Sequence, residues 1–456
     1  MASHALERGL TAQSTATVRI LTRPLPARSP EPDDPAPGEI GAEDVEDALL
    51  EGDRTLERSM AGAALRYPVF RRVFGAALVS NVGNWMQTVV LAAFVYRLTG
   101  SSTDVSLITL AQLGPLFVLS PVGGVAADRF DRRRMLLVVT LEQTVVAVVI
   151  TLLVSQSHPA FWALFATVMF GGIGQAFYAP TYSALIPTLV APEHLPGAVS
   201  LNSVNMNLSR VIGPAIGGVL YAKVGVRWVF AGNAVSYFAL IGALATVRLP
   251  PAVISLGARG WRRMAAGLAV ARRDRVVGRC LSTMVLFSFF CLPIAVLMPV
   301  LAHEDLHIAG NSIAYGLLYA SFGAGAVVGA LSIGTFLADQ QLEVVVRFGL
   351  AGFAVTLSAF ALVRNAAPAY PIVFLVGLCY FATVTSLATV LQKRLDNSVR
   401  GRVMALWVMA FGGTVPLGAI VAGPLSEVVG ISPVILAGAV VAGVLAFFAD
   451  LRPAST

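Results

Sequence analysis

After residue 72 the chain is a succession of apolar segments, each about as long as a lipid bilayer is thick. A helix needs about 20 mostly apolar residues to cross a membrane, and these runs are continuous rather than alternating, which favours helices over the strands of a barrel. Only 12% of the residues are charged, against about 25% in soluble proteins, so an ordinary soluble enzyme is excluded, as is a nucleic-acid binder. We therefore predict an all-α membrane protein with twelve transmembrane helices, at residues 73–96, 105–127, 135–154, 161–179, 198–221, 228–247, 281–302, 314–337, 344–363, 370–390, 403–425 and 433–449.

Positive charge sets the predicted orientation, because Lys and Arg gather on the cytoplasmic side of membrane proteins. With the N-terminus in the cytoplasm, 21 of the 26 Lys and Arg residues after position 60 lie on the inner side. The inverted topology would place the same 21 residues outside. Twelve crossings put the C-terminus inside as well, so we predict a multi-pass protein of the bacterial cytoplasmic (inner) membrane.

The chain divides where its composition changes. Residues 1–66, rich in Pro, Ala and acidic side chains, predict a disordered cytoplasmic tail. The spans form an N-terminal bundle, 67–247, and a C-terminal bundle, 281–449, followed by a cytoplasmic C-terminus, 450–456. The connection 248–280 mixes arginines with apolar residues, which predicts an amphipathic helix on the inner membrane surface; a plain linker is the alternative.

The two halves resemble each other. Residues 185–225 align with residues 390–430 at an offset of 205, which brings three pairs of glycines into register. Such a parallel duplication predicts two six-helix bundles related by an axis normal to the membrane, with a central cavity. The matched pairs are Gly213 with Gly418, Gly218 with Gly423 and Gly225 with Gly430.

Polar side chains inside the spans are candidate substrate contacts, because lipid makes them costly to bury. At 100° per residue, Asn81, Asn84 and Trp85 fall on one face of the first span, and Asn202 and Asn205 on one face of the fifth. We predict a roomy, mostly apolar cavity for an aromatic or amphiphilic solute; hydrogen bonding between helices is an equally open alternative. The predicted cavity residues are Asn81, Asn84, Trp85, Gln112, Gln175, Asn202, Asn205 and Tyr380.

Two charged residues lie within the predicted spans. Glu142 is about 10 Å along its helix from Met135, at 1.5 Å per residue. Arg210 lies near the middle of the fifth span. A carboxylate in a medium of low dielectric can load and release a proton, so Glu142 is the predicted proton carrier and Arg210 a coupling or structural partner. The alternative for Glu142 is an acid that reaches the headgroups or caps a helix.

The loop after the second span carries a motif. Residues 121–136, PVGGVAADRFDRRRML, resemble the loop between helices 2 and 3 of the major facilitator superfamily. Small residues such as Gly124 let helices approach closely. The resemblance implies that Asp128 meets the start of the eleventh helix, around residues 402–406, and latches the outward-facing state. Ala126 and Asp131 depart from the family pattern, and Asp131 replaces a turn glycine. The predicted latch residues are Gly124, Asp128, Arg129, Arg132 and Arg133.

The fifth span carries SRVIGPAIGG, in which Gly213, Pro214, Gly217 and Gly218 resemble part of a motif of antiporters in this superfamily. Packing without coupling is the alternative. The segments SNVGNWMQ (80–87) and RGRVMALW (400–407) resemble the branch that contains the enterobactin exporter and macrolide efflux proteins, the transmembrane secretion effectors. The similarity covers roughly residues 70–430 and favours export over uptake.

A competing signal is HEDLH at residues 303–307, which fits the His-Glu-x-x-His zinc motif. It lies at the outer end of the seventh span, with no convincing Asp-containing partner motif after it. We favour a polar outer loop over a membrane zinc metalloprotease.

These observations predict a secondary active transporter of the major facilitator fold and not an enzyme. It would export a small amphiphilic molecule, drug-like or siderophore-like, by proton antiport with alternating access. Its partners would be the small-molecule substrate, protons and membrane lipid, with no cofactor, metal or nucleic acid, and it would act as a monomer. A proton-coupled uptake symporter and a sensor without transport are the alternatives.

Overall fold

The computed structural model describes residues 62–247, 261–335 and 341–449, and the regular structure in these residues is helical. The predicted all-α membrane fold is confirmed. Two of the twelve spans are broken, the seventh between α11 and α12 and the eleventh by a π-helical turn, η3. The spans are α4 (Pro68–Thr99), α5 (Ser102–Arg129), α6 (Arg132–Val154), α7 (Phe161–Leu185), α8 (Leu195–Val224), α9 (Val226–Thr246), α11 (Arg275–Phe290) with α12 (Pro293–Glu304), α13 (Ile313–Thr335), α14 (Leu342–Leu362), α15 (Ala366–Arg394), α16 (Asn397–Val408) with η3 (Met409–Gly413) and α17 (Thr414–Val429), and α18 (Ile431–Phe448).

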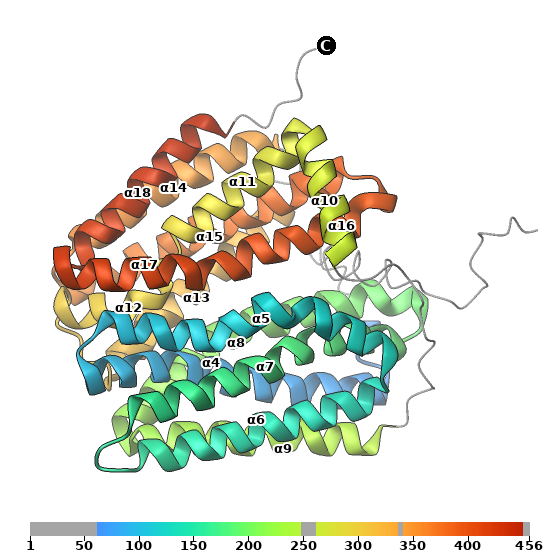
Figure 1. Cartoon of the computed structure of the whole chain (residues 1–456), viewed down its shortest axis with the longest axis horizontal. Coiled ribbons are helices and arrows are strands. Elements are labelled where there is room, and N and C mark those ends of the chain that lie inside the picture. Colours follow the sequence, from blue (N-terminus) through green and yellow to red (C-terminus); the bar gives the residue numbers. More distant parts are fainter. Residues whose placement is uncertain (1–61, 248–260, 336–340, 450–456) are drawn as a thin grey trace, which may run out of the picture. The chain divides into compact units, whose positions relative to one another are not determined.

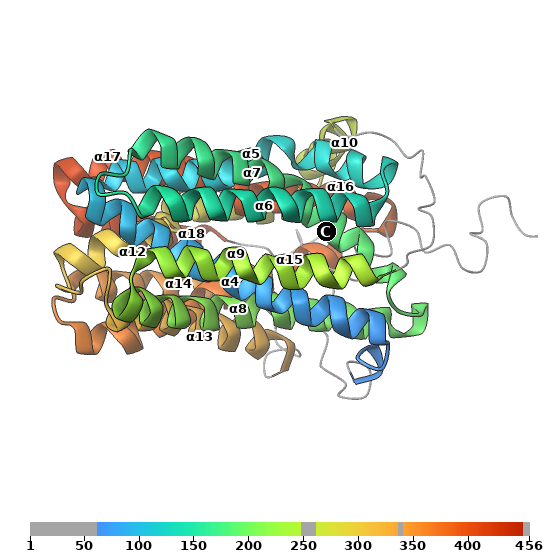
Figure 2. The ribbon, with the colours of Figure 1, turned by 90° about the horizontal axis from the view of Figure 1, so that it is seen from below.

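Length and apolarity alone identify eleven of these spans within the described ranges, and the one they miss is α8. Asn202, Asn205 and Arg210 are among the residues that make it polar. Even so, α8 packs along both α4 and α13, and Figure 2 shows it lying beside them. A helix this polar is tolerated because its neighbours shield it from lipid.

Short polar side chains set where several helices begin. The Ser101 side chain accepts a hydrogen bond from the Asp104 amide at 3.0 Å, before α5. The Asp131 side chain does the same for the Arg134 amide at 2.7 Å, before α6. Each side chain satisfies a backbone N–H that has no partner within its helix. Asp131, which departs from the family pattern, therefore begins a helix here.

The helices form two groups (Figure 1). In the first, α4 packs on α8 and α9, α5 on α7, and α6 on α7 and α9. In the second, α13 and α14 pack on α15, and α14 also packs on α18. The groups meet where α8 contacts α13 and where α5 contacts α17. These two contacts have equivalent places in the two halves, as expected of a duplicated fold.

The internal repeat is visible in the backbone. Gly225 joins α8 to α9 with φ 92° and ψ 167°, and Gly430 joins α17 to α18 with φ 84° and ψ 162°. A positive φ favours glycine. Gly213 and Gly418 also correspond, because each lies against the first helix of its own half, α4 or α11. The alignment at an offset of 205 is thus confirmed at these positions.

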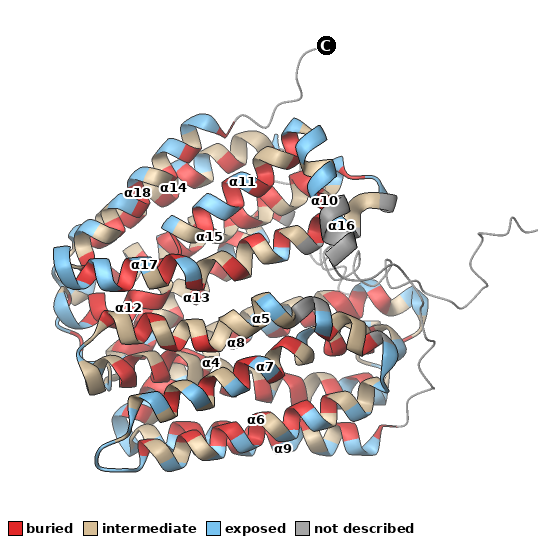
Figure 3. Ribbon diagram, viewed as in Figure 1, coloured by how far each residue is buried: buried red, intermediate tan, exposed pale blue. Residues whose placement is uncertain are grey.

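Exposed residues recur along the helices on the outside of the bundles (Figure 3). Along α6, exposed Val138, Leu141, Val145, Val148 and Leu152 recur every three or four residues and so share one face. Water does not solvate such a stripe well, but bilayer hydrocarbon does. The chain is accordingly a multi-pass membrane protein.

The predicted N-terminal tail, except residues 62–66, and the C-terminal segment 450–456 lie outside the described residues. In the connection between the halves, α10 (Trp261–Arg273) is a helix that packs on α16. At Gly267 the two backbones are so close that a Cβ would lie 2.6 Å from the Arg402 carbonyl oxygen. Within the described part of the connection, α10 thus packs on protein, whereas residues 248–260 lie outside the described residues.

Candidate functional site

The two halves are tied together at the end of the helices where α4 is followed by α5, which lies to the left in Figure 1. Gly100 lies between these two helices, and Gly225 and Gly430 lie at the links α8–α9 and α17–α18 of the same end. We call it the Gly100 end. There the Ser102 hydroxyl donates to the Gly423 carbonyl at 2.8 Å, and the Ser426 hydroxyl donates to Ser102 at 2.7 Å. The opposite end, with the arginines that follow α5, is called the Arg129 end.

Further contacts between the halves occur at the Gly100 end. The Glu427 carboxylate accepts from the Ser101 hydroxyl at 2.7 Å and from the Thr103 amide at 3.0 Å. The Tyr96 hydroxyl donates to the Glu304 carboxylate at 2.7 Å. Together these bonds hold the halves in contact at the Gly100 end.

Glycines make two equivalent close contacts across the same region. A Cβ on Gly218 of α8 would lie 2.6 Å from the Cα of Gly316 on α13. A Cβ on Gly423 of α17 would collide with the Ser106 side chain on α5. The sequence repeat thus places one small residue of each half against the second helix of the other. Small residues at both contacts allow the helices to approach closely.

The antiporter-like motif of α8 lies between two neighbours. A Cβ on Gly213 would be 2.6 Å from the Cβ of Trp85, and one on Gly217 would be 2.8 Å from the Met86 side chain, both on α4. The carbonyl of Pro214 faces Gly316 on α13. Packing is therefore one role of Gly213, Pro214, Gly217 and Gly218 in this structure.

Arg210 lies between the halves. Its guanidinium carbon is 5.1 Å from the centre of the Trp85 ring on α4 and 4.9 Å from that of Phe381 on α15. Its Nε is buried and has no hydrogen-bond partner in the described part of the chain. A permanent positive charge is thus held by two aromatic faces from opposite halves.

Tyr380, a predicted cavity residue, is buried in an aromatic cluster of the C-terminal half. Its ring stacks on Phe287, Phe322 and Phe411 with centroids 5.9–6.4 Å apart, and meets Phe381 edge-on at 4.6 Å. Because Phe381 also contacts Arg210, the cluster continues to the boundary between the halves.

Several predicted cavity residues bond to neighbouring helices. The Asn81 amide donates to the Asn205 carbonyl oxygen at 3.2 Å, joining α4 to α8, and the Gln112 amide donates to Thr88 at 2.8 Å, joining α5 to α4. Asn202 is buried on α8. The Asn205 amide nitrogen is buried without a partner among the described residues.

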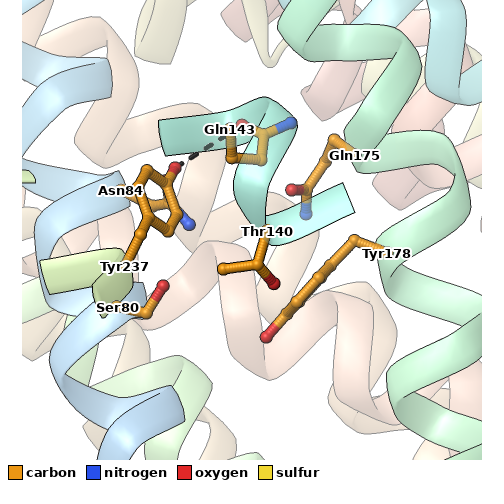
Figure 4. A pocket seen from close by; sticks show the side chains of 7 residues that line it. All are labelled: Ser80, Asn84, Thr140, Gln143, Gln175, Tyr178 and Tyr237. Atoms are coloured by element: carbon orange, nitrogen blue, oxygen red, sulfur yellow. Dashed lines mark hydrogen bonds between the residues drawn. The ribbon is translucent and has the colours of Figure 1, made fainter. Parts of the chain in front are cut away.

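Asn84 and Gln175 belong to a different place, a polar pocket inside the N-terminal bundle (Figure 4). Asn84 accepts a hydrogen bond from Tyr237 of α9. The side chains leave no room between them for even a water molecule, whereas sites for drug-sized ligands hold about 300 Å³ or more, so the pocket is too small for a drug-sized solute. Its lining residues are Ser80, Asn84, Thr140, Gln143, Gln175, Tyr178 and Tyr237.

The residues of α4 that were predicted to face one cavity therefore face two different places. Asn84 and Trp85 are 100° apart on the helix, and that is enough for one to face α9 and the other α8. Gln143 and Tyr237 were absent from the predicted site, although both are polar and lie in apolar spans, which is the signal that could have found them.

Glu142 lies at the contact of α6 with α7. Its Oε2 accepts from the Gln143 amide at 3.0 Å, and its Oε1 is buried with no partner among the residues described. A Cβ on Gly174 of α7 would collide with this carboxylate. Glycine at this position makes room for the acid. Arg210 faces other residues, so the two charges do not form an ion pair in this structure.

Among the predicted latch residues, the close approach falls on a different glycine. A Cβ on Gly124 would meet nothing within 4 Å, whereas one on Gly123 would collide with the Ala176 carbonyl of α7. In this structure Gly123, and not Gly124, is the glycine that faces α7. The side chain of Asp128 lies outside the described residues.

The arginines of the motif bind helix ends of the N-terminal half. Arg132 donates to the Ala184 carbonyl at 3.0 Å, near the end of α7. Arg133 donates to the Leu244 and Ala245 carbonyls, both at 2.7 Å, near the end of α9. Cations are favoured at helix C-termini. Arg129 is exposed.

The HEDLH segment is not a helical zinc motif. α12 ends at Glu304, and His307 has φ 55°. His303 and His307 therefore do not share one helix face, as the motif requires. No group of three metal-binding side chains occurs among the described residues. The zinc metalloprotease alternative is dropped.

Two similar helical halves, tied at one end and meeting around an arginine that lies between aromatic rings, define a membrane transporter of the major facilitator superfamily rather than an enzyme. The chain belongs to the transmembrane secretion effector family, whose model matches residues 59–454. The expected resemblance is thereby confirmed.

Characterised relatives are exporters by name. The chain is 23% identical to macrolide efflux protein A of Streptococcus pyogenes, over 80% of this chain and 90% of the relative. It is 28% identical to the enterobactin exporter EntS of Escherichia coli O1:K1 / APEC, over 75% of this chain and 81% of the relative.

The fold resembles a transporter homologue that has been solved in two conformational states. The chain is 17% identical to a bacterial homologue of the iron transporter ferroportin in the inward-facing state, with a TM-score of 0.66 over 84% of this chain and 99% of that one. Against the outward-facing state the identity is 18% and the TM-score 0.54, over 84% and 100%. The arrangement of the helices is thus more similar to the inward-facing structure.

Proposed function

We propose that the chain exports a small amphiphilic molecule across the bacterial cytoplasmic membrane by proton antiport, with alternating access. The observation that carries this proposal is the pair of equivalent contacts, Gly218 with Gly316 and Gly423 with Ser106, that close the Gly100 end. Two similar halves joined at one end can rock about that contact. The direction is supported by relatives whose names describe efflux and export.

In this proposal the moving units are residues 67–247 and 281–449, with both termini in the cytoplasm and the Gly100 end outside. The connection through α10 stays on the inner side. Gly124, Asp128 and Arg129 would engage the start of α16 when the Arg129 end closes. Arg132 and Arg133, which bind helix ends within their own half, would keep that half rigid. The chain would act as a monomer.

Glu142 is the proposed proton carrier. It lies between α6 and α7 of the N-terminal bundle, with one carboxylate oxygen unpaired among the described residues, and it contacts the polar pocket through Gln143. No cation holds this partly buried carboxyl group in its charged form, which leaves it able to take up and release a proton. The pocket is the proposed path of the proton to and from Glu142.

Substrate would bind between the halves, at Trp85, Asn205 and Arg210 on one side and the Tyr380 cluster on the other. Asn81, Gln112 and Asn202 would shape the N-terminal side of that site.

The test is transport in inverted membrane vesicles that hold an acid-inside pH gradient, with a macrolide and a catecholate siderophore as trial substrates. Export by antiport predicts accumulation inside the vesicles that a protonophore abolishes. Proton-driven loss of preloaded substrate would instead indicate uptake symport, and no gradient-dependent flux of either kind would contradict the proposal.

A further inference from the structure

The guanidinium of Arg210 lies between the halves with two aromatic faces against it, and although the Tyr380 hydroxyl is near, its buried Nε has no hydrogen-bond partner in the described part of the chain. Trp85 and Phe381 lie 5.1 and 4.9 Å from its central carbon. None of the ion pairs formed among the described residues includes it. A guanidinium has five N–H donors and is always charged, and aromatic faces leave most of these donors unsatisfied.

The neighbouring contact between α4 and α8 likewise has more hydrogen-bond donors than acceptors. One turn along α4 from Trp85, Asn81 donates its amide to the Asn205 oxygen, and Ser209 shares that oxygen at 3.4 Å. The Asn205 amide nitrogen is left buried without a partner in the described ranges. Two successive contacts of the same helix pair thus offer N–H groups and lack an acceptor.

Buried donors are costly unless something accepts from them, and a buried charge is costly unless it is paired. Arg210, Trp85 and Phe381 are each partly exposed, so a ligand has access to all three. A carboxylate is the ligand group that matches a guanidinium in charge and shape, through two parallel hydrogen bonds. The aromatic rings on both sides favour a flat, unsaturated body attached to that anion.

We propose that Arg210 is the recognition residue for an organic anion with an aromatic ring, an aromatic carboxylate being the simplest member of the class. The anion binds the guanidinium and the ring lies against Trp85 or Phe381. Because these two residues belong to opposite halves, such a ligand contacts both halves at once. The proposal deepens the export function above, since it names the substrate class of the same site and rests on that function.

The experiment measures equilibrium binding to the purified full-length protein, without a gradient. The probes are 2-naphthoate and its neutral isostere 2-naphthamide. The wild type is expected to bind the carboxylate more tightly than the amide. Arg210→Gln is expected to weaken 2-naphthoate binding by about tenfold or more and to leave the amide unchanged. Arg210→Lys keeps the positive charge but cannot form the two parallel hydrogen bonds of a guanidinium, so it is expected to bind 2-naphthoate with intermediate affinity.

Arg364→Gln serves as a matched control, because Arg364 is half exposed in a pair with Asp305 outside the site. It should bind both probes as the wild type does. Equal binding of carboxylate and amide by the wild type, or no binding of either, would overturn the proposal even if the Arg210 variants fail to fold. So would unchanged naphthoate binding by a folded Arg210→Gln protein. Anion binding without proton-driven flux would count against the transport function instead.

Discussion

At the scale of single residues, the two charged groups Glu142 and Arg210 have surroundings that differ sharply. Glu142 has a neutral amide beside it and a glycine opposite, whereas Arg210 has two aromatic rings. An acid without a cation can exchange a proton, and an arginine without an acid can hold an anion. The two charges are therefore suited to separate tasks.

The first prediction concerns the proton. Glu142→Gln preserves the size and polarity of the side chain but cannot be ionised, so we expect loss of efflux driven by a pH gradient while substrate exchange without a gradient persists. The measurement is vesicle transport in both modes. Glu193→Gln is the control, since Glu193 is an exposed acid outside the pocket. Gradient-driven efflux at the wild-type rate in Glu142→Gln would remove this residue from the coupling.

The sequence predicts most of the polar residues of the spans but not which of them share a site. Asn84 and Trp85 are adjacent in the chain, and only the packing of α8 and α9 around α4 decides that they face different sites. Gln143 and Tyr237 complete the pocket from helices distant in sequence. Helical periodicity gives the direction in which a side chain points from its own helix axis, but it does not say which neighbouring helix lies in that direction.

At the scale of elements, the helices are positioned by small residues and by caps. The sequence predicted the spans well, because apolar length is a property of each segment by itself. It did not reveal which of the paired glycines Gly123 and Gly124 faces α7, since that depends on the rotation of α5 against its neighbour. The polar character of α8 likewise makes sense only with α4 and α13 beside it.

The second prediction compares those two glycines. Gly123→Ala places a methyl group against the Ala176 carbonyl, and we expect it to destabilise the fold by about 1–3 kcal/mol, as overpacking usually does. Gly124→Ala meets open space and should leave stability unchanged or slightly raised. Thermal unfolding of the purified protein distinguishes them. Equal melting temperatures for the two variants would contradict the packing of α5 on α7.

The third prediction concerns Asp274, which caps α11 at the predicted inner surface. Burial alone would raise the pKa of this carboxyl group, but hydrogen bonds from the Val277 and Val276 amides and the Arg394 side chain outweigh it and hold the pKa below its usual value. Asp274→Ala should cost about 1 kcal/mol at neutral pH.

A lowered pKa in the folded state means that the ionised form stabilises the fold. This contribution is complete above the ordinary aspartate pKa of about 4 and is lost as the pH falls through the lower folded value. The difference in melting temperature between wild type and Asp274→Ala should therefore shrink below about pH 4. A difference that grows on acidification would show that the charge is not stabilising.

At the scale of the whole molecule, the two duplicated halves are joined by contacts at one end of the helices. The offset of 205 residues brought Gly218 and Gly423 into register, and the structure places both at contacts between the halves. The sequence could predict the duplication, but not which end of the bundles is closed, because one sequence can adopt either closed state and the relative free energies of the two states decide which is populated. The hydrogen bonds of Ser102, Ser426 and Glu427 identify the closed end as the Gly100 end.

The most direct test of alternating access is a cross-link across that closed end. Ser102 and Ser426 are joined by a 2.7 Å hydrogen bond between hydroxyls of opposite halves, so Ser102→Cys with Ser426→Cys should form a disulfide when Cys280, Cys291 and Cys379 are replaced by Ala. We expect oxidation to stop transport completely and a reductant to restore it, while each single cysteine variant transports in both conditions. Wild-type transport by protein in which the disulfide has formed quantitatively would contradict alternating access, because the Gly100 end would then never need to open.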